Sequence, residues 1–209
     1  MRTNVYVDGF NLYYGCLKDS PYKWLDLEAL CRRLLPKHQI GRIRYFTAHV
    51  SGRGDAQGPA RQQAYLRALR TSSKVTVHRG HFLTKPTRMI LASPPAGGPR
   101  TVEVLKTEEK GSDVNLATCL LVDAFRKDAE AYVVITNDSD LKEPIRIVQH
   151  ELGCAVGVIN PHSPRMRSRA LLSCKPAFFK QIRRSALARS QFPATLADGR
   201  GKITKPRAW

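Results

Sequence analysis

Near its start the chain contains the stretch Asn4-Val5-Tyr6-Val7-Asp8-Gly9-Phe10-Asn11. Its second half contains a similar stretch, Tyr132-Val133-Val134-Ile135-Thr136-Asn137-Asp138-Ser139-Asp140. Each begins as an apolar run that predicts a buried strand, and each ends in acidic and amide side chains. In an α/β protein, the loops at the carboxyl ends of parallel strands form the ligand crevice, so we expect these carboxylates to meet. Carboxylates that face one another repel, and a divalent cation between them relieves that repulsion.

The hydrophobic pattern around these stretches predicts alternating strands and helices. Strands are expected over residues 3–8, 40–50, 75–83, 131–136 and 155–159, and helices over residues 25–35, 60–69, 113–125 and 141–152. A loop is expected over residues 52–58, and the Pro- and Gly-rich segment 93–99 predicts a turn between paired hairpin segments. This βαβ rhythm indicates an α/β fold with a mostly parallel sheet.

The length and charge of the chain indicate one domain with a basic tail. The sequence has 209 residues and a formal net charge of +18. We expect a domain over residues 1–160 and a basic C-terminal extension over 161–209, partly helical at 177–187, irregular from 194 and packed on the domain. Such a charge favours polyanions, which makes nucleic acid the first expected partner; the alternative is a basic surface that serves solubility.

Several classes of protein are disfavoured by what the sequence lacks. The five cysteines are scattered singly, without the spacing of zinc sites or a disulfide framework, which favours a reducing cytoplasm. No apolar stretch is long enough for a membrane span, and Asp8 leaves no room for a signal-peptide core. Glycine-rich phosphate loops are absent, so no nucleotide cofactor is expected. His78, His81 and His162 are isolated in sequence and are interpreted as structural.

Each acidic residue also has a purely structural interpretation. Asp8 is able to cap a helix, with Asn11 one turn further on to hold a water, a metal or a phosphate oxygen. Asp138 or Ser139 is able to cap the next helix, and Asp113 suits the first turn of its own helix. Three acidic strand or helix ends in one sheet are nevertheless explained better together than singly, and we predict a shared metal site.

Three motifs resemble the NYN domain of the PIN-like nuclease superfamily. They are Val7-Asp8-Gly9-Phe10-Asn11-Leu12-Tyr13, Glu109-Lys110-Gly111-Ser112-Asp113-Val114-Asn115-Leu116-Ala117 and Ile135-Thr136-Asn137-Asp138-Ser139-Asp140-Leu141, and the likeness covers about residues 3–160. The resemblance implies a Rossmann-like (PIN-like) α/β/α sandwich and an endoribonuclease that depends on Mg²⁺ or Mn²⁺. It implies metal binding by Asp8, Asp113, Asp138 and Asp140, and catalysis by these four acids with Asn11. Cys119 departs from the family pattern, because several relatives carry a further Asp there; we expect it to be a small core residue.

Basic residues in two regions are predicted to contact nucleic acid. Lys106 and Lys110 precede the helix of Asp113 and suit phosphate neutralisation, although solvated lysines are the alternative. The tail contributes a strip of arginines at Arg165, Arg167, Arg169, Arg183 and Arg184, interspersed with Phe178, Phe179 and Phe192. We expect these aromatic residues to pack on the core and the arginines to bind phosphate.

The leading hypothesis is therefore a metal-dependent ribonuclease acting on single-stranded or loop regions of RNA. A non-catalytic RNA- or DNA-binding module that retains the fold is one alternative. A small-molecule phosphoesterase is another. The sequence leaves open the oligomeric state, the choice between RNA and DNA, endo- versus exonucleolytic cleavage, and the number of metal ions.

Overall fold

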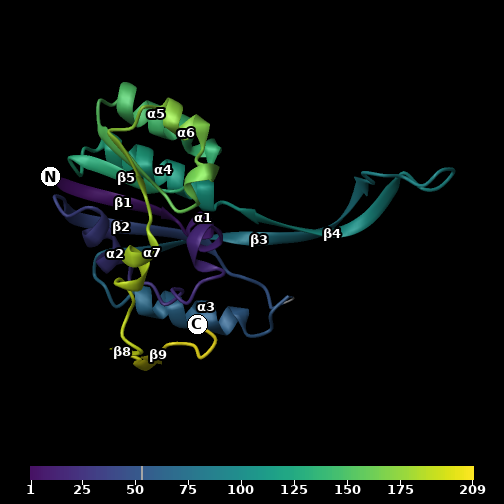
Figure 1. Ribbon diagram of the computed structural model, residues 1–209, viewed down its shortest axis with the longest axis horizontal. Helices are drawn as coiled ribbons and strands as arrows, with labels where there is room; N and C mark the ends of the chain where they lie inside the picture. Colours follow the sequence, from purple (N-terminus) through teal and green to yellow (C-terminus); the bar gives the residue numbers. More distant parts are fainter. Residues whose placement is uncertain (53) are drawn as a thin grey trace.

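A seven-stranded sheet forms the centre of the computed structural model, which describes residues 1–52 and 54–209 (Figure 1). Its strands lie in the order β4-β3-β2-β1-β5-β6-β7. They are β1 (Arg2–Asp8), β2 (Gln39–Ala48), β3 (Val75–Ile90), β4 (Thr101–Lys110), β5 (Ala131–Ile135), β6 (Ala155–Asn160) and β7 (Phe178–Gln181). Every neighbouring pair is parallel except β3 and β4. The predicted α/β fold with a mostly parallel sheet is confirmed.

Helices cover both faces of the sheet (Figure 1). One face carries α2 (Leu27–Leu34), α3 (Gly58–Leu69) and α7 (Arg184–Ala188), and the other carries α4 (Ser112–Phe125), α5 (Lys142–His150) and α6 (Arg169–Ser173). Successive strand side chains point to opposite faces, so Val5 and Val7 join the first core while Tyr6 joins the second. Shorter turns complete the chain: α1 (Gly9–Leu12), a π-helix (Tyr13–Leu17), and 3₁₀ helices at Ser139–Leu141 and Pro164–Met166.

The parallel strands bring distant residues to one edge of the sheet. Asp8 ends β1, Thr136 follows β5, Asn160 ends β6 and Gln181 ends β7, all at the carboxyl edge. Helix α4 begins at this edge with Ser112, directly after β4. The predicted acidic site therefore draws its residues from β1, from the loop after β5 and from the start of α4.

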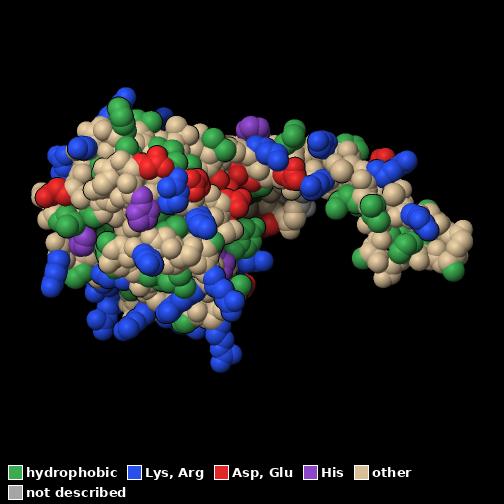
Figure 2. Space-filling model, turned by 90° about the horizontal axis from the view of Figure 1, so that it is seen from above, with side chains coloured by type: hydrophobic (Ala, Val, Ile, Leu, Met, Phe, Trp, Pro, Cys, Tyr) green, Lys and Arg blue, Asp and Glu red, His purple; other side chains and the backbone are tan. Residues whose placement is uncertain are grey.

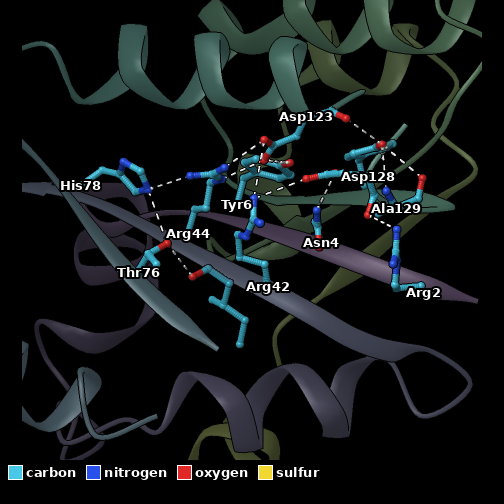
Figure 3. A network of polar contacts seen from close by, with 12 residues as sticks. Arg2, Asn4, Tyr6, Arg42, Arg44, Thr76, His78, Asp123, Asp128 and Ala129 are labelled. Atoms are coloured by element: carbon cyan, nitrogen blue, oxygen red, sulfur yellow. Dashed lines mark hydrogen bonds and ion pairs between the residues drawn. The ribbon is translucent and has the colours of Figure 1, made fainter. Parts of the chain in front are cut away.

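An ionic network fastens α4 to the sheet (Figure 3). Nε and Nη2 of Arg44 on β2 donate to the two carboxylate oxygens of Asp123 on α4 at 2.8 and 2.9 Å, and the hydroxyl of Tyr6 donates to Asp123 at 2.7 Å. Asp123 is only 3% exposed. Arg42 pairs with Asp128 at 3.3 Å beside it. Because Asp113 lies on the same helix, this network also sets the position of that acid.

Strands β3 and β4 extend beyond the sheet as a long antiparallel arm (Figure 1). The sequence predicted a hairpin here but ended its first strand at residue 83, whereas β3 continues to Ile90. Backbone pairing of residues 81–90 with 101–110 provides the ladder bonds that carry the strand on without a core. Apolar side chains on the arm are consequently exposed, with Ile90 at 81% and Leu105 at 66%.

The C-terminal region is more ordered than the sequence suggested. The helix expected over residues 177–187 is wrong, because β7 joins the sheet beside β6 and only the short α7 follows. The ring of Phe178 lies where a Cβ on Gly157 would stand, so this glycine admits the strand. The segment from residue 194 is likewise not irregular; it forms the hairpin β8 (Thr195–Asp198) and β9 (Gly201–Thr204).

Aromatic contacts anchor this C-terminal region. The rings of Phe192 and Trp209 pack on Trp24, with their centroids 5.9 and 6.3 Å from that of Trp24, and the packing of Phe192 confirms the prediction. The division expected at residue 160 falls between β6 and β7 of one sheet. Residue 53, part of the loop expected over 52–58, lies outside the described residues. None of the helices in the part of the chain that the structure describes has the length and apolar character to cross a bilayer.

Candidate metal centre

Asp8 is buried at the end of β1 and held by two donors. Its Oδ1 accepts the backbone N–H of Asn11 at 2.9 Å, so the expected helix cap is present. Its Oδ2 accepts the hydroxyl of Thr136 at 2.9 Å. Burial raises the pKa of Asp8, while both donors oppose the rise. The strand leaves Asp8 through Gly9, where a Cβ would lie 2.7 Å from the ring of Tyr45, so this position requires glycine.

Asp138 follows β5 and caps the short 3₁₀ helix at Ser139–Leu141. Its Oδ1 accepts the backbone N–H of Asp140 at 3.0 Å, which uses one carboxylate oxygen for the cap. Its own N–H donates to the hydroxyl of Thr136 at 3.0 Å. The single hydroxyl of Thr136 thus connects Asp8 and Asp138.

Asp113 lies in the first turn of α4 but does not cap that helix. Glu109 on β4 accepts the N–H of Ser112 at 3.1 Å and so occupies the capping role. Gly111 turns the chain into the helix with φ of +97°, a conformation that favours glycine. The structural alternative for Asp113, an acid in the first turn that favours the helix dipole, is therefore present as well.

The three acids converge at the base of the arm, where acidic side chains gather in Figure 2. Asp8, Asp113 and Asp138 each offer one carboxylate oxygen, and these oxygens lie within 4.8 Å of one another. Burial, together with the charges of Asp8, Asp138, Glu109 and Asp140, raises the pKa of Asp113 to about 6. Three convergent carboxylates with this electrostatic strain fit a hard divalent cation, which prefers oxygen ligands.

The other predicted members of the site stand around this group. Asp140 is exposed and outside the group of three, although its charge reaches Asp113. The side-chain oxygen of Asn11 accepts the N–H of Asn137 at 3.1 Å and lies 3.1 Å from Nε2 of His162. Asn11 therefore joins the β1 and β5 loops. Sequence reasoning set His162 aside because its partner is 151 residues away, and no local signal marks that contact.

Cys119 and the two predicted lysines have other partners. Cys119 is half-buried against the core under α4, and burial raises the pKa of its thiol. Both lysines pair with Glu108, Lys106 at 2.5 Å and Lys110 at 3.1 Å. These two ion pairs lower the pKa of Glu108 to about 2. Phosphate binding by either lysine stays a prediction, and it requires exchange of this partner.

The tail arginines are distributed over two neighbouring grooves. A groove of about 610 Å³ is lined by the cations Arg33, Arg167, Lys180, Arg183 and Arg189. The adjoining groove of about 530 Å³ shares Gln181 and Arg183 with it, is lined also by Arg184, and reaches His162 and Tyr14. Arg165 and Arg169 are exposed outside the linings of both grooves. Arg33 was missed, because only the tertiary fold brings it beside the tail; Lys180 lies within the tail but was not among the predicted cations.

The predicted aromatic packing in the tail is present. Phe178 packs against the core under α2, and Phe179 packs against the core under α5. The guanidinium of Arg167 lies 6.0 Å from the ring centroid of Phe179. The arginine side chain thus stacks on an aromatic residue whose other contacts are structural.

Comparisons with known proteins agree with this architecture. The family model of the NYN domain matches residues 2–183, which includes β7. The chain is 32% identical to 6-hydroxy-3-succinoylpyridine 3-monooxygenase HspA of Pseudomonas putida, across all of this chain and 75% of that protein. A crystal structure of a protein of unknown function from Vibrio parahaemolyticus superposes with a TM-score of 0.57 at 17% identity, covering 88% of this chain and 93% of that one; this likeness concerns the fold alone. The chain therefore belongs to the NYN domain family, within the PIN-like nuclease superfamily.

Proposed function

We propose that this protein is an endoribonuclease that hydrolyses single-stranded or loop regions of RNA with Mg²⁺ or Mn²⁺. The observation that carries the proposal is the convergence of Asp8, Asp113 and Asp138 within 4.8 Å from three separate elements of the chain. Membership of the NYN family supports it. The excess of positive charge, +18 over the chain, supports a polyanionic substrate.

In this proposal the three carboxylates hold the cation, and Thr136 and Asn11 fix the orientation of Asp8. A bound divalent ion would activate water and neutralise charge on the phosphoryl group. Asp140 is exposed beside the site and would accept a proton from an incoming water or bind a metal-bound water. His162 would hold Asn11 in the orientation that accepts the N–H of Asn137.

The two basic grooves supply a path for the RNA backbone. They share residues with each other, and the second reaches Tyr14, which also lines a cavity beside Asp8. Five cations line the first groove, so a phosphate backbone would be neutralised there before it reaches the acidic centre. In this arrangement Arg167, Arg183 and Arg184 bind phosphate directly, while Arg165 and Arg169 add charge from outside the grooves. The singly placed free cysteines suit a cytoplasmic location.

A circular single-stranded RNA tests the proposal, because only an endonuclease opens it. We expect cleavage with Mn²⁺ or Mg²⁺, none with EDTA, and a loss of at least 100-fold in Asp138→Asn. The matched control is Glu103→Gln, which removes an exposed acid on the arm and should leave cleavage unchanged. Cleavage that persists in both EDTA and Asp138→Asn would overturn the proposal. A circular DNA of the same sequence separates ribonuclease from deoxyribonuclease.

The printed name of the Pseudomonas putida relative favours a second candidate function, the oxygenation of a small substituted pyridine. Such a reaction attaches one atom of O₂ to a carbon of the ring and reduces the other atom to water with a two-electron donor. Oxygen uptake with 6-hydroxy-3-succinoylpyridine and NADH, with and without added flavin, measures it. Uptake that depends on the pyridine, together with an intact circular RNA, would favour this function over the nuclease.

A further inference from the structure

A cavity with aromatic walls lies beside the metal centre and takes no part in holding its carboxylates. It has a volume of about 280 Å³, and Gly9 and Phe10, which directly follow Asp8, form part of its lining. Its aromatic lining comes from α1, the π-helix, β2, α3 and the end of the chain: Phe10, Tyr13, Tyr14, Tyr45, Tyr65 and Trp209. The volume lies just below the range typical of sites for drug-sized ligands, which suits a ligand of one or two rings.

Tyr14 is the exposed ring among the aromatic residues that line the cavity. Tyr14 is 61% exposed, which is unusual for a tyrosine that also lines a cavity. Its ring meets that of Tyr13 edge-on, with centroids 5.2 Å apart, and the ammonium of Lys18 lies 5.3 Å from its centroid. The ring of Trp209 packs edge-on against Tyr65 at 5.9 Å. Aromatic pairs prefer such edge and offset geometries, so a planar ligand would extend an existing cluster.

Hydrogen bonds hold Tyr65 and Gln62 in the wall of the cavity. The hydroxyl of Tyr65 donates to the carbonyl of Leu25 at 3.0 Å. The side-chain oxygen of Gln62 accepts the N–H of Val50 at 3.0 Å, and its amide nitrogen donates to the carbonyl of Ala48 at 2.8 Å. The amide of Gln62 therefore supports the wall of the cavity. Preformed walls reduce the ordering that binding requires.

Positive charge stands beside these aromatic walls. Lys23 donates to the carbonyl of Ser20 at 3.1 Å, and the described residues give it no ion pair. Arg61 pairs with Asp55, and both line the cavity. A ligand that combines a flat ring with an anionic group would therefore contact both kinds of side chain.

We propose that this cavity binds a planar aromatic ring that carries an anionic group. One source of that ring is a base of the RNA strand next to the phosphodiester at the metal centre, and this source rests on the proposed nuclease function. The other source is a free heteroaromatic carboxylate. In both cases the ring stacks on Tyr14, and the anionic group faces Lys23.

Calorimetric titration in EDTA tests the site without cleavage or metal binding. The probes are AMP, the ring-free analogue ribose 5-phosphate, and nicotinate as a free heteroaromatic carboxylate. We expect AMP or nicotinate to bind, ribose 5-phosphate to bind at least tenfold more weakly than AMP, and Tyr14→Ala to lose roughly tenfold in affinity. Tyr14→Phe should stay within about twofold of wild type, and Phe125→Ala, which removes an exposed ring from α4, should change nothing.

A blocking variant checks the location of the site. A Cβ on Gly54 would meet nothing within 4 Å, so a side chain is accommodated there, and Gly54→Trp adds a large group at the rim of the cavity that should weaken binding. Binding of AMP alone assigns the ring to RNA, and binding of nicotinate alone assigns it to a free molecule. The proposal is overturned if neither probe binds, if ribose 5-phosphate binds as well as AMP, or if Tyr14→Ala and Gly54→Trp bind like wild type. Loss of RNA cleavage in Asp138→Asn with unchanged binding of AMP would separate this site from the metal centre.

Discussion

The hydroxyl of Thr136 lies 2.9 Å from Oδ2 of Asp8 and donates a hydrogen bond to it, across the junction of β1 and β5. The hydroxyl oxygen of Thr136 also accepts the N–H of Asp138 at 3.0 Å. One buried hydroxyl therefore orients the carboxylate of Asp8 and holds the backbone of Asp138, which lies beyond a different strand. This relationship gives the metal centre a support that is independent of the ion.

Replacing this hydroxyl should weaken metal binding without unfolding the protein. Valine has nearly the same shape as threonine but lacks the hydroxyl, so in Thr136→Val the carboxylate of Asp8 and the N–H of Asp138 each lose their hydrogen-bond partner. Removal of a residue that orients metal ligands typically costs 10- to 100-fold in metal affinity, and we expect a loss in that range. A calorimetric titration with Mn²⁺ measures the metal affinity of both proteins. Thr136→Ser retains the hydroxyl and should bind within about threefold of wild type; equal affinity in Thr136→Val would show that the contact is dispensable.

Removing one acid should stabilise the metal-free protein while it abolishes stabilisation by metal. Burial and four neighbouring acids raise the pKa of Asp113, so its negative charge opposes folding at neutral pH. Because this carboxylate is half-buried, we discount the effect and expect Asp113→Asn to raise Tm in EDTA by about 2–4 °C, on the order of 1 kcal/mol for a domain of this size. Added Mn²⁺ should raise the Tm of wild type but not of the variant. A lower Tm for the variant in EDTA would argue against electrostatic strain at the centre.

The affinity for metal should fall as the solution becomes acidic. A carboxyl with a pKa of about 6 carries its proton below that pH, and a ligand must lose the proton to bind. The pKa of Asp113 is higher in the folded than in the unfolded chain, so its contribution to metal-free stability is present below about pH 4 and is lost as the pH rises toward 6. Calorimetry with Mn²⁺ between pH 5 and 8 should show the steepest change near pH 6. A flat profile would mean that Asp113 is ionised throughout.

The buried ionic network should contribute more to stability than an exposed ion pair. Asp123→Asn leaves Arg44 without its counter-ion under α4, and we expect a loss of about 3 kcal/mol in the free energy of unfolding. The exposed control Arg32→Gln breaks a pair with Glu28 on α2 and should cost less than about 0.5 kcal/mol. Urea unfolding in EDTA measures both. The double variant Asp123→Leu/Arg44→Met, with neither charge left, should recover most of the loss.

The salt dependence of RNA binding should locate the backbone path. For a single strand, each phosphate contact contributes about 0.7 to the slope of log affinity against log salt. Arg167→Gln and Arg183→Gln each remove one cation from the basic groove, so the slope should fall by about 0.7 in each variant and about 1.4 in the double variant. Fluorescence anisotropy in EDTA, at several salt concentrations, measures the RNA affinity of each variant and hence its slope. Arg126→Gln, exposed at the far end of α4, is the matched control; an equal effect there would mean that the charge acts without a defined path.

The sequence alone was sufficient to predict the strands that carry the acids. The buried apolar runs before Asp8 and Asp138 each form a central strand, because a strand buried on both faces needs continuous apolar residues. The convergence of Asp8 and Asp138 followed from parallel topology, since parallel strands present their carboxyl ends at one edge, whereas Asp113 comes to that edge through the antiparallel return of β4. Three motifs were also sufficient to indicate the NYN family.

The tertiary structure alone decided contacts between residues with no local pattern. Glu109 accepts the N–H of Ser112 at the start of α4, Glu108 forms ion pairs with Lys106 and Lys110, and His162 contacts Asn11. The strand β7 was mistaken for helix, because Phe178 and its neighbours are apolar at a spacing that suits both structures and only the space over Gly157 selects the strand.

Sequence thus determined which backbone segments are buried and which ends carry charge, because hydrophobic periodicity is a local property of the chain. Only the folded chain determined which charged and aromatic side chains meet, including those of the cavity at Tyr14 and of the network at Asp123. Electrostatic and stacking contacts depend on distances of a few ångströms between residues far apart in sequence. Those distances are fixed by packing, which no short stretch of residues specifies.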